Sequence, residues 1–217
     1  MKLERMDEFF DSRLNDYESH MLECIESAKI FYPFTASLLP INPEANILDL
    51  GCGTGLELEF YLKQNPSANI TGIDLSKGML DALRKKLPLP NITLIEGSYF
   101  DLPFQENCYD AAVSVESLHH FTQSEKIPLY QKLKRALKDD GYFILTDYFA
   151  ANDADEILFR STYEALKKEE GIKDHEFYHY DTPLTVTHEI EALCLAGFSS
   201  VEILSSWGST YTLKASV

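Results

Sequence analysis

Short apolar runs alternate with amphipathic segments through most of the chain. Runs typical of buried strands lie near residues 46–51, 69–74, 91–96, 109–115 and 141–148. Segments whose apolar residues recur three or four positions apart, as in helices, lie near 55–64, 77–87 and 124–138. Strands that alternate with helices predict an α/β fold, in which a largely parallel sheet is covered by helices on both faces.

The two ends of the chain depart from this alternation. Residues 186–197 have the pattern of a helix that Gly197 closes at its C′ position. Two β-rich runs, 199–206 and 210–216, follow and predict a terminal hairpin. Residues 1–40 form a helical segment before the first strand, and residues 149–185 form an insertion before the last helix.

A glycine motif follows the first predicted strand. Gly51, Gly53 and Gly55 occupy alternate positions directly before a helical pattern. A buried strand that turns sharply into a helix needs residues without Cβ, both for positive φ and for close approach of a ligand. Asp74 ends the next predicted strand, where a carboxylate can accept both hydroxyls of a ribose. These features predict a nucleoside-binding site.

The motif also narrows the choice of nucleoside. A dinucleotide fingerprint would place a third glycine at position 56, but Leu56 stands there, and the chain has no Gly-Lys-Ser/Thr to cradle a triphosphate. Asp49 precedes the glycines, where its charge would repel a phosphate and attract a cationic amino group. A ligand with a ribose, an ammonium group and no phosphate is S-adenosylmethionine (SAM).

Four motifs in order resemble those of the class I SAM-dependent methyltransferases. They are the glycine motif, Asp74 in Gly72-Ile-Asp-Leu-Ser, the adenine-loop segment 96–104, and the segments 109–121 and 133–147. The resemblance covers about residues 46–148 and implies a Rossmann-like three-layer αβα sandwich. Its seven-stranded sheet would be mostly parallel, with an antiparallel C-terminal strand.

The resemblance implies a set of cofactor-binding residues for SAM, and for its product S-adenosylhomocysteine. The set comprises Tyr17, Asp49, Gly51, Cys52, Gly53, Asp74, Leu75, Met79, Ser98 and Tyr99. Ser98 departs from the family pattern, which often has Asp after the adenine-loop glycine. Arg13 is a candidate partner for the SAM carboxylate, with a solvent-exposed charge as the alternative.

Glu116, His119 and His120 are the candidate catalytic residues, because they follow the fourth strand, where substrate and methyl group meet in this family. His is the usual side chain for proton transfer near neutral pH. A structural role is the alternative for each of them. The cluster of His175, Tyr178, His179 and Tyr180 in the insertion lines the substrate pocket or forms an aromatic lid. We predict no metal site, since no carboxylate–histidine pattern of a metalloenzyme accompanies this cluster.

Length and composition describe an ordinary soluble protein. The 217 residues predict one domain, 1–217, in which the arm 1–40 and the insertion 149–185 form the substrate lid by analogy with the family. The net charge of −16 disfavours a nucleic-acid partner. Basic residues cluster in the helix near 124–138, and we expect them on its solvated outer face: Lys126, Lys132, Lys134, Arg135 and Lys138.

The remaining sequence signals are negative. The four cysteines lie far apart, which suggests neither a disulfide framework nor zinc binding. No apolar stretch has the length of a membrane helix, and the acidic N-terminus does not resemble a signal peptide. We therefore expect a cytoplasmic protein, monomeric or homodimeric, with no membrane partner.

The predicted function is transfer of a methyl group from SAM to an oxygen, nitrogen or carbon nucleophile of a small-molecule acceptor. The sequence does not choose among these atoms, and it does not show whether a general base is used. Three alternatives stay open: an enzyme that modifies transfer RNA, an enzyme that uses a modified SAM, and a SAM-binding protein without methyl transfer.

Overall fold

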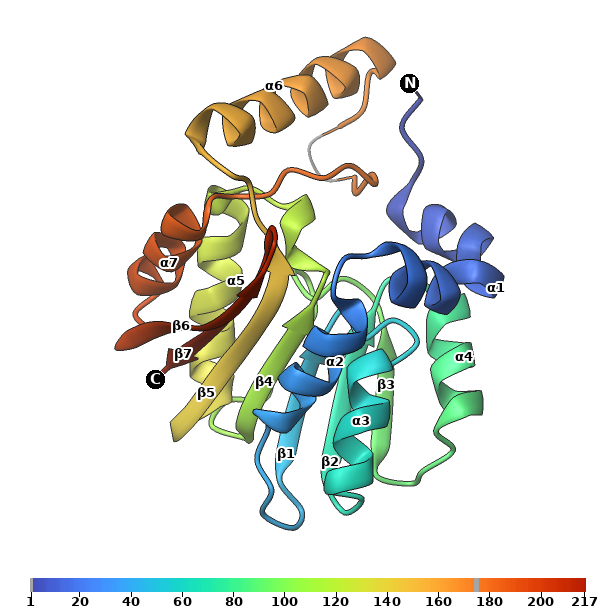
Figure 1. Cartoon of the computed structure of the whole chain (residues 1–217), viewed down its shortest axis with the longest axis vertical. Coiled ribbons are helices and arrows are strands. Elements are labelled where there is room, and N and C mark those ends of the chain that lie inside the picture. The colour runs from blue at the N-terminus through green and yellow to red at the C-terminus, as the bar shows by residue number, and fades with distance from the viewer. Residues whose placement is uncertain (1, 174–175) are drawn as a thin grey trace.

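A computed structural model describes residues 2–173 and 176–217. A seven-stranded sheet of order β3-β2-β1-β4-β5-β7-β6 forms its centre (Figure 1). The strands are β1 (Asn46–Leu50), β2 (Asn69–Asp74), β3 (Ile92–Glu96), β4 (Tyr109–Val115), β5 (Leu137–Tyr148), β6 (Ser200–Trp207) and β7 (Thr210–Ser216). The first five are parallel neighbours, whereas β7 runs antiparallel to both β5 and β6. This confirms the predicted fold class.

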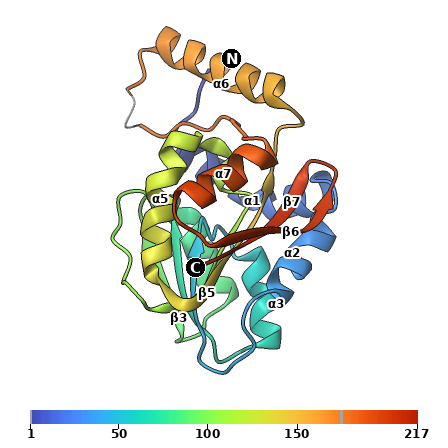
Figure 2. The same ribbon diagram turned by 90° about the vertical axis from the view of Figure 1, so that its left-hand side faces the viewer.

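Helices cover both faces of the sheet (Figure 2). They are α1 (Met6–Cys24), α2 (Ala28–Ser37), α3 (Leu56–Gln64), α4 (Lys77–Lys86), the 3₁₀ turn η1 (Leu118–His120), α5 (Gln123–Ala136), α6 (Asp153–Glu170) and α7 (Val186–Leu195). Leu48 and Leu50 point into a core with α5 and α7, while Ile47 points into a core with α2 and α3. The alternation of side chains along β1 therefore places Asp49 on the α3 side.

Most predicted elements agree with the structure to within two residues. Ser76 caps α4 by accepting a hydrogen bond from the Met79 N–H at 3.0 Å. Gly197 closes α7 with φ of +99°, as predicted. The fifth strand is longer than expected, because Leu137 already pairs with Tyr109, so α5 ends at Ala136.

The expected solvated face of α5 is wrong at two positions. Lys126 is fully buried, with its Nζ 2.5 Å from Glu189 Oε2 of α7, and the Tyr130 hydroxyl donates to the same carboxylate. Lys132 donates to the carbonyl oxygens of Tyr99, Phe100 and Leu102 at 2.6–2.9 Å. The clustering of basic residues along the helix could not reveal these partners, because the partners come from distant parts of the chain.

The N-terminal arm divides into two parts with different surroundings. Phe31 and Tyr32 of α2 are buried in the core beside α3. In contrast, α1 lies near α6 at the end of the molecule toward which the parallel strands point (Figure 1). The arm is joined to the insertion by backbone hydrogen bonds, from the Met6 N–H to the Phe177 oxygen and from the His179 N–H to the Glu4 oxygen.

Within residues 2–173 and 176–217, no helix is both long and apolar enough to span a membrane.

Candidate active site

The turn after β1 requires glycine for steric reasons. Gly51 and Gly53 have φ of +75° and +48°, which L side chains rarely adopt. A Cβ on Gly51 would lie only 2.0 Å from the Ser117 Oγ. The backbone at this turn therefore approaches the loop after β4 as closely as it can, and the predicted role of the glycine motif in forming a tight cleft has a physical basis.

Asp74 is fixed at the carboxyl end of β2. Its Oδ2 accepts the Gly53 N–H and its Oδ1 accepts the Ser76 N–H, both at 2.8 Å. Burial raises the pKa of this carboxyl group. Asp74 lines a cleft together with Leu75, Met79 and Tyr99. The lone pairs not used by the two backbone donors remain for hydroxyl groups, so the geometry suits a ribose.

Asp49 and Glu57 form a buried acidic pair beneath the glycine turn. Both oxygens of Asp49 and the Glu57 Oε1 have no hydrogen-bond partner within the described residues. Burial raises the pKa of Asp49 well above its ordinary value, and the charge of Glu57 adds to this effect. Buried carboxylates without partners are costly. A cationic amino group is the ligand that would satisfy them, so the residues present fit the ammonium group of SAM.

Helix α1 closes the cofactor cleft from above. Met6, Phe10 and Tyr17 lie against the residues described above and leave a cavity of about 50 Å³. Small-molecule sites have volumes of roughly 300–1,000 Å³. Asp11 Oδ1 accepts hydrogen bonds from the Ser76 hydroxyl at 2.5 Å and from the Gly78 N–H at 3.0 Å, which fastens α1 to α4. The structure therefore shows a closed conformation.

Three residues of the predicted cofactor set do not line the cleft, namely Asp49, Cys52 and Ser98, and the candidate Arg13 lines the larger cavity described below instead. Cys52 is buried against Gly72 of β2, and Ser98 Oγ accepts the Phe100 N–H at 3.1 Å; neither lines the cleft. Arg13 pairs with Glu4 at 3.0 Å and stacks on Phe9 at 3.7 Å. Their roles toward SAM stay predictions, with Cys52 and Ser98 placed to support the cleft wall.

A larger cavity of about 710 Å³ adjoins the cofactor cleft. Its aromatic, acidic and histidine side chains come from α1, the loop after β4, the insertion and the β6–β7 hairpin. Four residues line both spaces, namely Phe10, Tyr17, Glu116 and His120. We call this space the acceptor cavity, because a molecule in it would face the bound cofactor.

Glu116 stands at the junction of the two spaces. Its φ of +50° is unusual for a residue other than glycine, and such strained positions cluster at functional sites. Burial and the charge of Asp147 raise the pKa of Glu116 to about 8. The Thr210 hydroxyl is 3.4 Å from its Oε1. Glu116 can therefore exchange a proton near neutral pH.

His119 lies between two carboxylates that the sequence reading missed. Its Nδ1 donates to Asp147 Oδ1 at 2.6 Å, and its Nε2 is 3.5 Å from Asp181 Oδ1. Burial lowers the pKa of His119, but the two carboxylates outweigh this and raise it well above its ordinary value. Asp147 also accepts the Leu118 N–H at 2.9 Å, so it holds η1 in place. Asp147 ends the motif segment 133–147 and Asp181 follows the 175–180 cluster, but neither was predicted to meet His119, and only the fold brings them together.

His120 and His179 differ from His119 in that their pKa values are lowered. Burial and the charge of His119 lower the pKa of His120, and burial and His120 lower that of His179 to about 4. The two rings are 5.0 Å apart at the acceptor cavity, and His179 stacks on Phe9 at 3.5 Å. His179 therefore lines the acceptor cavity, whereas Tyr178 faces a second cavity and His175 lies outside the described residues.

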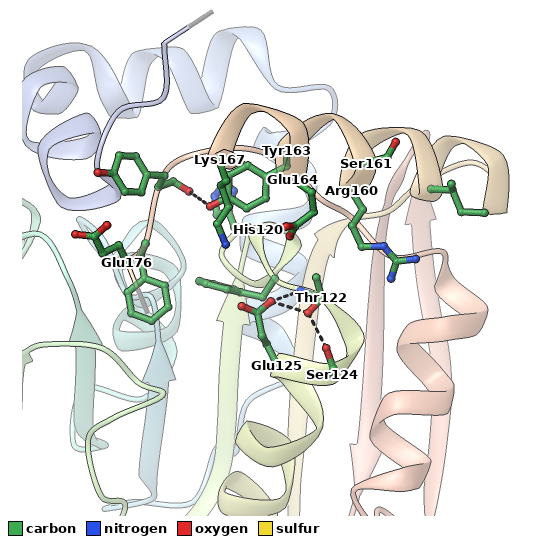
Figure 3. Close-up of a pocket in the computed structure, with 14 residues that line it drawn as sticks. His120, Thr122, Ser124, Glu125, Arg160, Ser161, Tyr163, Glu164, Lys167 and Glu176 are labelled. Atoms are coloured by element: carbon green, nitrogen blue, oxygen red, sulfur yellow. Dashed lines mark hydrogen bonds between the residues drawn. The ribbon is translucent and has the colours of Figure 1, made fainter. Parts of the chain in front are cut away.

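This second cavity, also about 710 Å³, lies between α6 and the start of α5 (Figure 3). Arg160, Tyr163 and Glu164 of α6 point into it, opposite Glu125 of α5. Its only residue in common with the acceptor cavity is His120. It also shares His120 with the cofactor cleft, but the acceptor cavity shares four residues with that cleft, so we place the chemistry in the acceptor cavity.

The fold and the cleft define a nucleoside-binding α/β protein whose residues suit SAM. The family profile described as a methyltransferase domain matches residues 47–141. An uncharacterized methyltransferase of Synechocystis sp. is 33% identical over 117 residues, which cover 54% of this chain and 53% of that protein. The 2-phytyl-1,4-naphtoquinone methyltransferase of Nostoc sp. is 29% identical over 127 residues, covering 56% and 55%.

Solved structures agree in fold. A crystal structure of an O-methyltransferase candidate from Nostoc punctiforme has a TM-score of 0.72 at 21% identity, covering 100% of this chain and 63% of that one. Residues 47–141 thus match a methyltransferase domain, and the residues that line the cleft suit SAM as its cofactor. The chain spans about half the length of the curated relatives named above.

Proposed function

We propose that this protein transfers a methyl group from SAM to an oxygen, nitrogen or carbon nucleophile of a small molecule bound in the acceptor cavity. The main support for this proposal is that four residues line both this cavity and the cofactor cleft, namely Phe10, Tyr17, Glu116 and His120. The 2-phytyl-1,4-naphtoquinone methyltransferase of Nostoc sp. is named for a small-molecule substrate, which supports this acceptor class.

Each group of residues has a distinct task in this proposal. Asp49 with Glu57 holds the cofactor ammonium, and Asp74 holds the ribose, as the unpaired oxygens of Asp49 and the strand-tip geometry of Asp74 support. Bound SAM supplies an activated methyl group on its sulfonium. The protein then has to position the nucleophile and exclude water.

Glu116 is the proposed proton acceptor when the acceptor must lose a proton. It is buried at the junction of cleft and cavity, and its pKa of about 8 suits proton transfer near neutral pH. His119, fixed between Asp147 and Asp181, is a positioning residue for this loop. His120 contacts both spaces and orients the acceptor.

We propose that the lid comprises fewer residues than the predicted ranges 1–40 and 149–185. Helix α1 and residues 176–181 cover the two spaces, whereas α2 packs in the core. Together with the sheet they would act as one SAM-binding domain.

The test is a screen of a metabolite library with radiolabelled SAM, with Glu116→Gln as the comparison. We expect at least one small molecule to accept label. Glu116→Gln should lower kcat/KM by about 10²–10⁴ if Glu116 is the base, with little change in SAM affinity. Labelled transfer RNA with no labelled small molecule would contradict the acceptor class. Cofactor binding without any transfer would favour a non-catalytic SAM-binding protein.

A further inference from the structure

Two histidines and an aspartate converge at the wall of the acceptor cavity. His119, His120 and Asp181 each offer a ligand atom, and these atoms all lie within 4.8 Å of one another. Two of the residues come from η1 and the third from the insertion, so the cluster exists only in the folded chain. Imidazole nitrogen and carboxylate oxygen are ligands that divalent transition metals accept.

The spacing of the cluster suits a shared ion better than direct pairing. The Asp181 Oδ1 lies 3.5 Å from His119 Nε2 and 3.3 Å from His120 Nδ1. This Nδ1 is also 3.2 Å from the Tyr180 carbonyl oxygen, so binding of a metal at Nδ1 requires the His120 tautomer with its proton on Nε2. Both distances to Asp181 exceed the usual hydrogen-bond range of about 2.7–3.2 Å. In a tetrahedral zinc site, with Zn–N and Zn–O bonds of about 2.0–2.1 Å, neighbouring ligand atoms are separated by about 3.4 Å. The two distances to Asp181 thus match this separation, and the ligand atoms of the two histidines lie within 4.8 Å of each other.

The surroundings of His119 also match a metal ligand. Its Nδ1 donates to Asp147 Oδ1 at 2.6 Å, which directs Nε2 toward Asp181. Metal-bound histidines almost always donate their second nitrogen to such an outer carboxylate, which fixes tautomer and ring orientation. Asp147 is itself held by the Leu118 N–H at 2.9 Å. The outer shell of a metal site is therefore already in place.

We propose that His119, His120 and Asp181 bind a divalent transition-metal ion, with Zn²⁺ the best match to the ligand set. Three protein ligands leave at least one position open, as in catalytic rather than structural zinc sites. The side chain of Asp181 is 48% exposed, and all three ligands line the acceptor cavity. The open position therefore faces the acceptor cavity. If the proposed function holds, an oxygen atom of the acceptor would bind there.

This proposal replaces the sequence-based expectation that the chain has no metal site. That expectation considered only the 175–180 cluster. Asp181 directly follows it, and Asp147 ends the fifth strand, so neither had a visible connection to the histidines after the fourth strand.

Calorimetric titration of EDTA-treated, dialysed protein with Zn²⁺ tests the site without SAM or an acceptor. We expect one Zn²⁺ per chain. Loss of an outer-shell partner costs about 10–100-fold in metal affinity, so loss of a ligand in Asp181→Asn should cost at least about 100-fold. Because Asp181 is half exposed, this variant should fold, which circular dichroism will verify.

His20→Gln is the matched control, because His20 is an exposed histidine that lines the same cavity outside the cluster. It should bind Zn²⁺ as the wild type does. Equal affinity of wild type and Asp181→Asn, or equal losses in His20→Gln and Asp181→Asn, would overturn the proposal. Affinity for S-adenosylhomocysteine, measured on the same samples, reports on the proposed function separately, since the metal ligands are not needed to hold the ribose or the ammonium.

A Co²⁺ titration tests the open position. Addition of catechol, an oxygen-donor probe, to Co²⁺-loaded protein should shift the visible absorption bands. Unchanged bands in the presence of catechol would refute an open position that faces the cavity.

Discussion

At the scale of single residues, two buried carboxyl groups lie beneath the glycine turn of the cofactor cleft. Asp49 and Glu57 are almost fully buried, and no cation is paired with the free oxygens of Asp49 in the described structure. Mutual repulsion and loss of water favour the protonated forms. A ligand that carries an ammonium group reverses this preference, because it stabilises the charged carboxylate. Cofactor binding and proton release are therefore coupled.

The first prediction concerns pH. The pKa of Asp49 is raised in the free protein by burial and by Glu57, and the ammonium group of SAM should lower it. Binding then releases a proton, so affinity for SAM should increase as pH rises toward the raised pKa of Asp49, by at most about tenfold per pH unit. Calorimetry in buffers of different ionisation enthalpy measures both effects. Glu57→Gln removes the repulsion and should flatten the dependence; affinity independent of pH, without proton exchange, would contradict the coupling.

The second prediction concerns stability. Lys126→Met leaves the Glu189 carboxylate buried without its cation and should lower the free energy of unfolding by about 3–5 kcal/mol. Arg135→Met, on the exposed side of the same helix, should change it by less than about 1 kcal/mol. Urea denaturation measures both variants. The double variant Lys126→Met/Glu189→Met should regain part of the loss. A single variant as stable as the wild type would show that the buried pair contributes nothing.

At the scale of elements, α1 governs access to the cofactor cleft. Phe10 and Tyr17 occupy space over the glycine turn, and the remaining cavity of about 50 Å³ cannot admit a nucleoside. Asp11 joins α1 to α4, and the Lys86–Glu18 ion pair of 2.6 Å adds a second link between them. Helix α1 contributes few buried residues to the two cores. It can therefore move while the sheet stays intact.

The third prediction follows from this attachment. Asp11→Ala removes two hydrogen bonds to a charged group, and each such bond contributes about 1.5–3 kcal/mol. The open conformation should be more populated, and S-adenosylhomocysteine should associate at least about tenfold faster in stopped-flow measurements. Asp7→Ala is the control, since Asp7 pairs with Arg5 on the exposed side of the same helix. An unchanged association rate in Asp11→Ala would mean that α1 does not limit entry.

At the scale of the whole molecule, features set by local sequence patterns could be predicted from the sequence, whereas features set by long-range contacts could not. The sheet was predictable because each strand and helix carries its own periodicity, and the glycine turn because it lies within nine residues. The roles of Glu57, Asp147 and Asp181 could not be predicted, because each depends on a residue that is distant in the sequence or was not recognised as its partner. The solvated reading of Lys126 failed for the same reason: its partner is 63 residues away.

The fourth prediction tests the division between sheet and lid. Deletion of residues 1–20 removes most of α1 but leaves α2 and both cores nearly complete. The truncated protein should keep its circular-dichroism spectrum and lose turnover, since water would enter the acceptor cavity. Full activity of the folded truncation would show that α1 is dispensable.

Binding of the cofactor product is the most direct test of the account. Calorimetric titration with S-adenosylhomocysteine should show one saturable site, and titration with NAD should show none, because Leu56 replaces the third glycine of a dinucleotide fingerprint. Asp74→Ala should weaken S-adenosylhomocysteine binding by about 1.5–3 kcal/mol and leave the fold unchanged. Saturable binding of NAD together with no binding of S-adenosylhomocysteine would contradict the cofactor site as described.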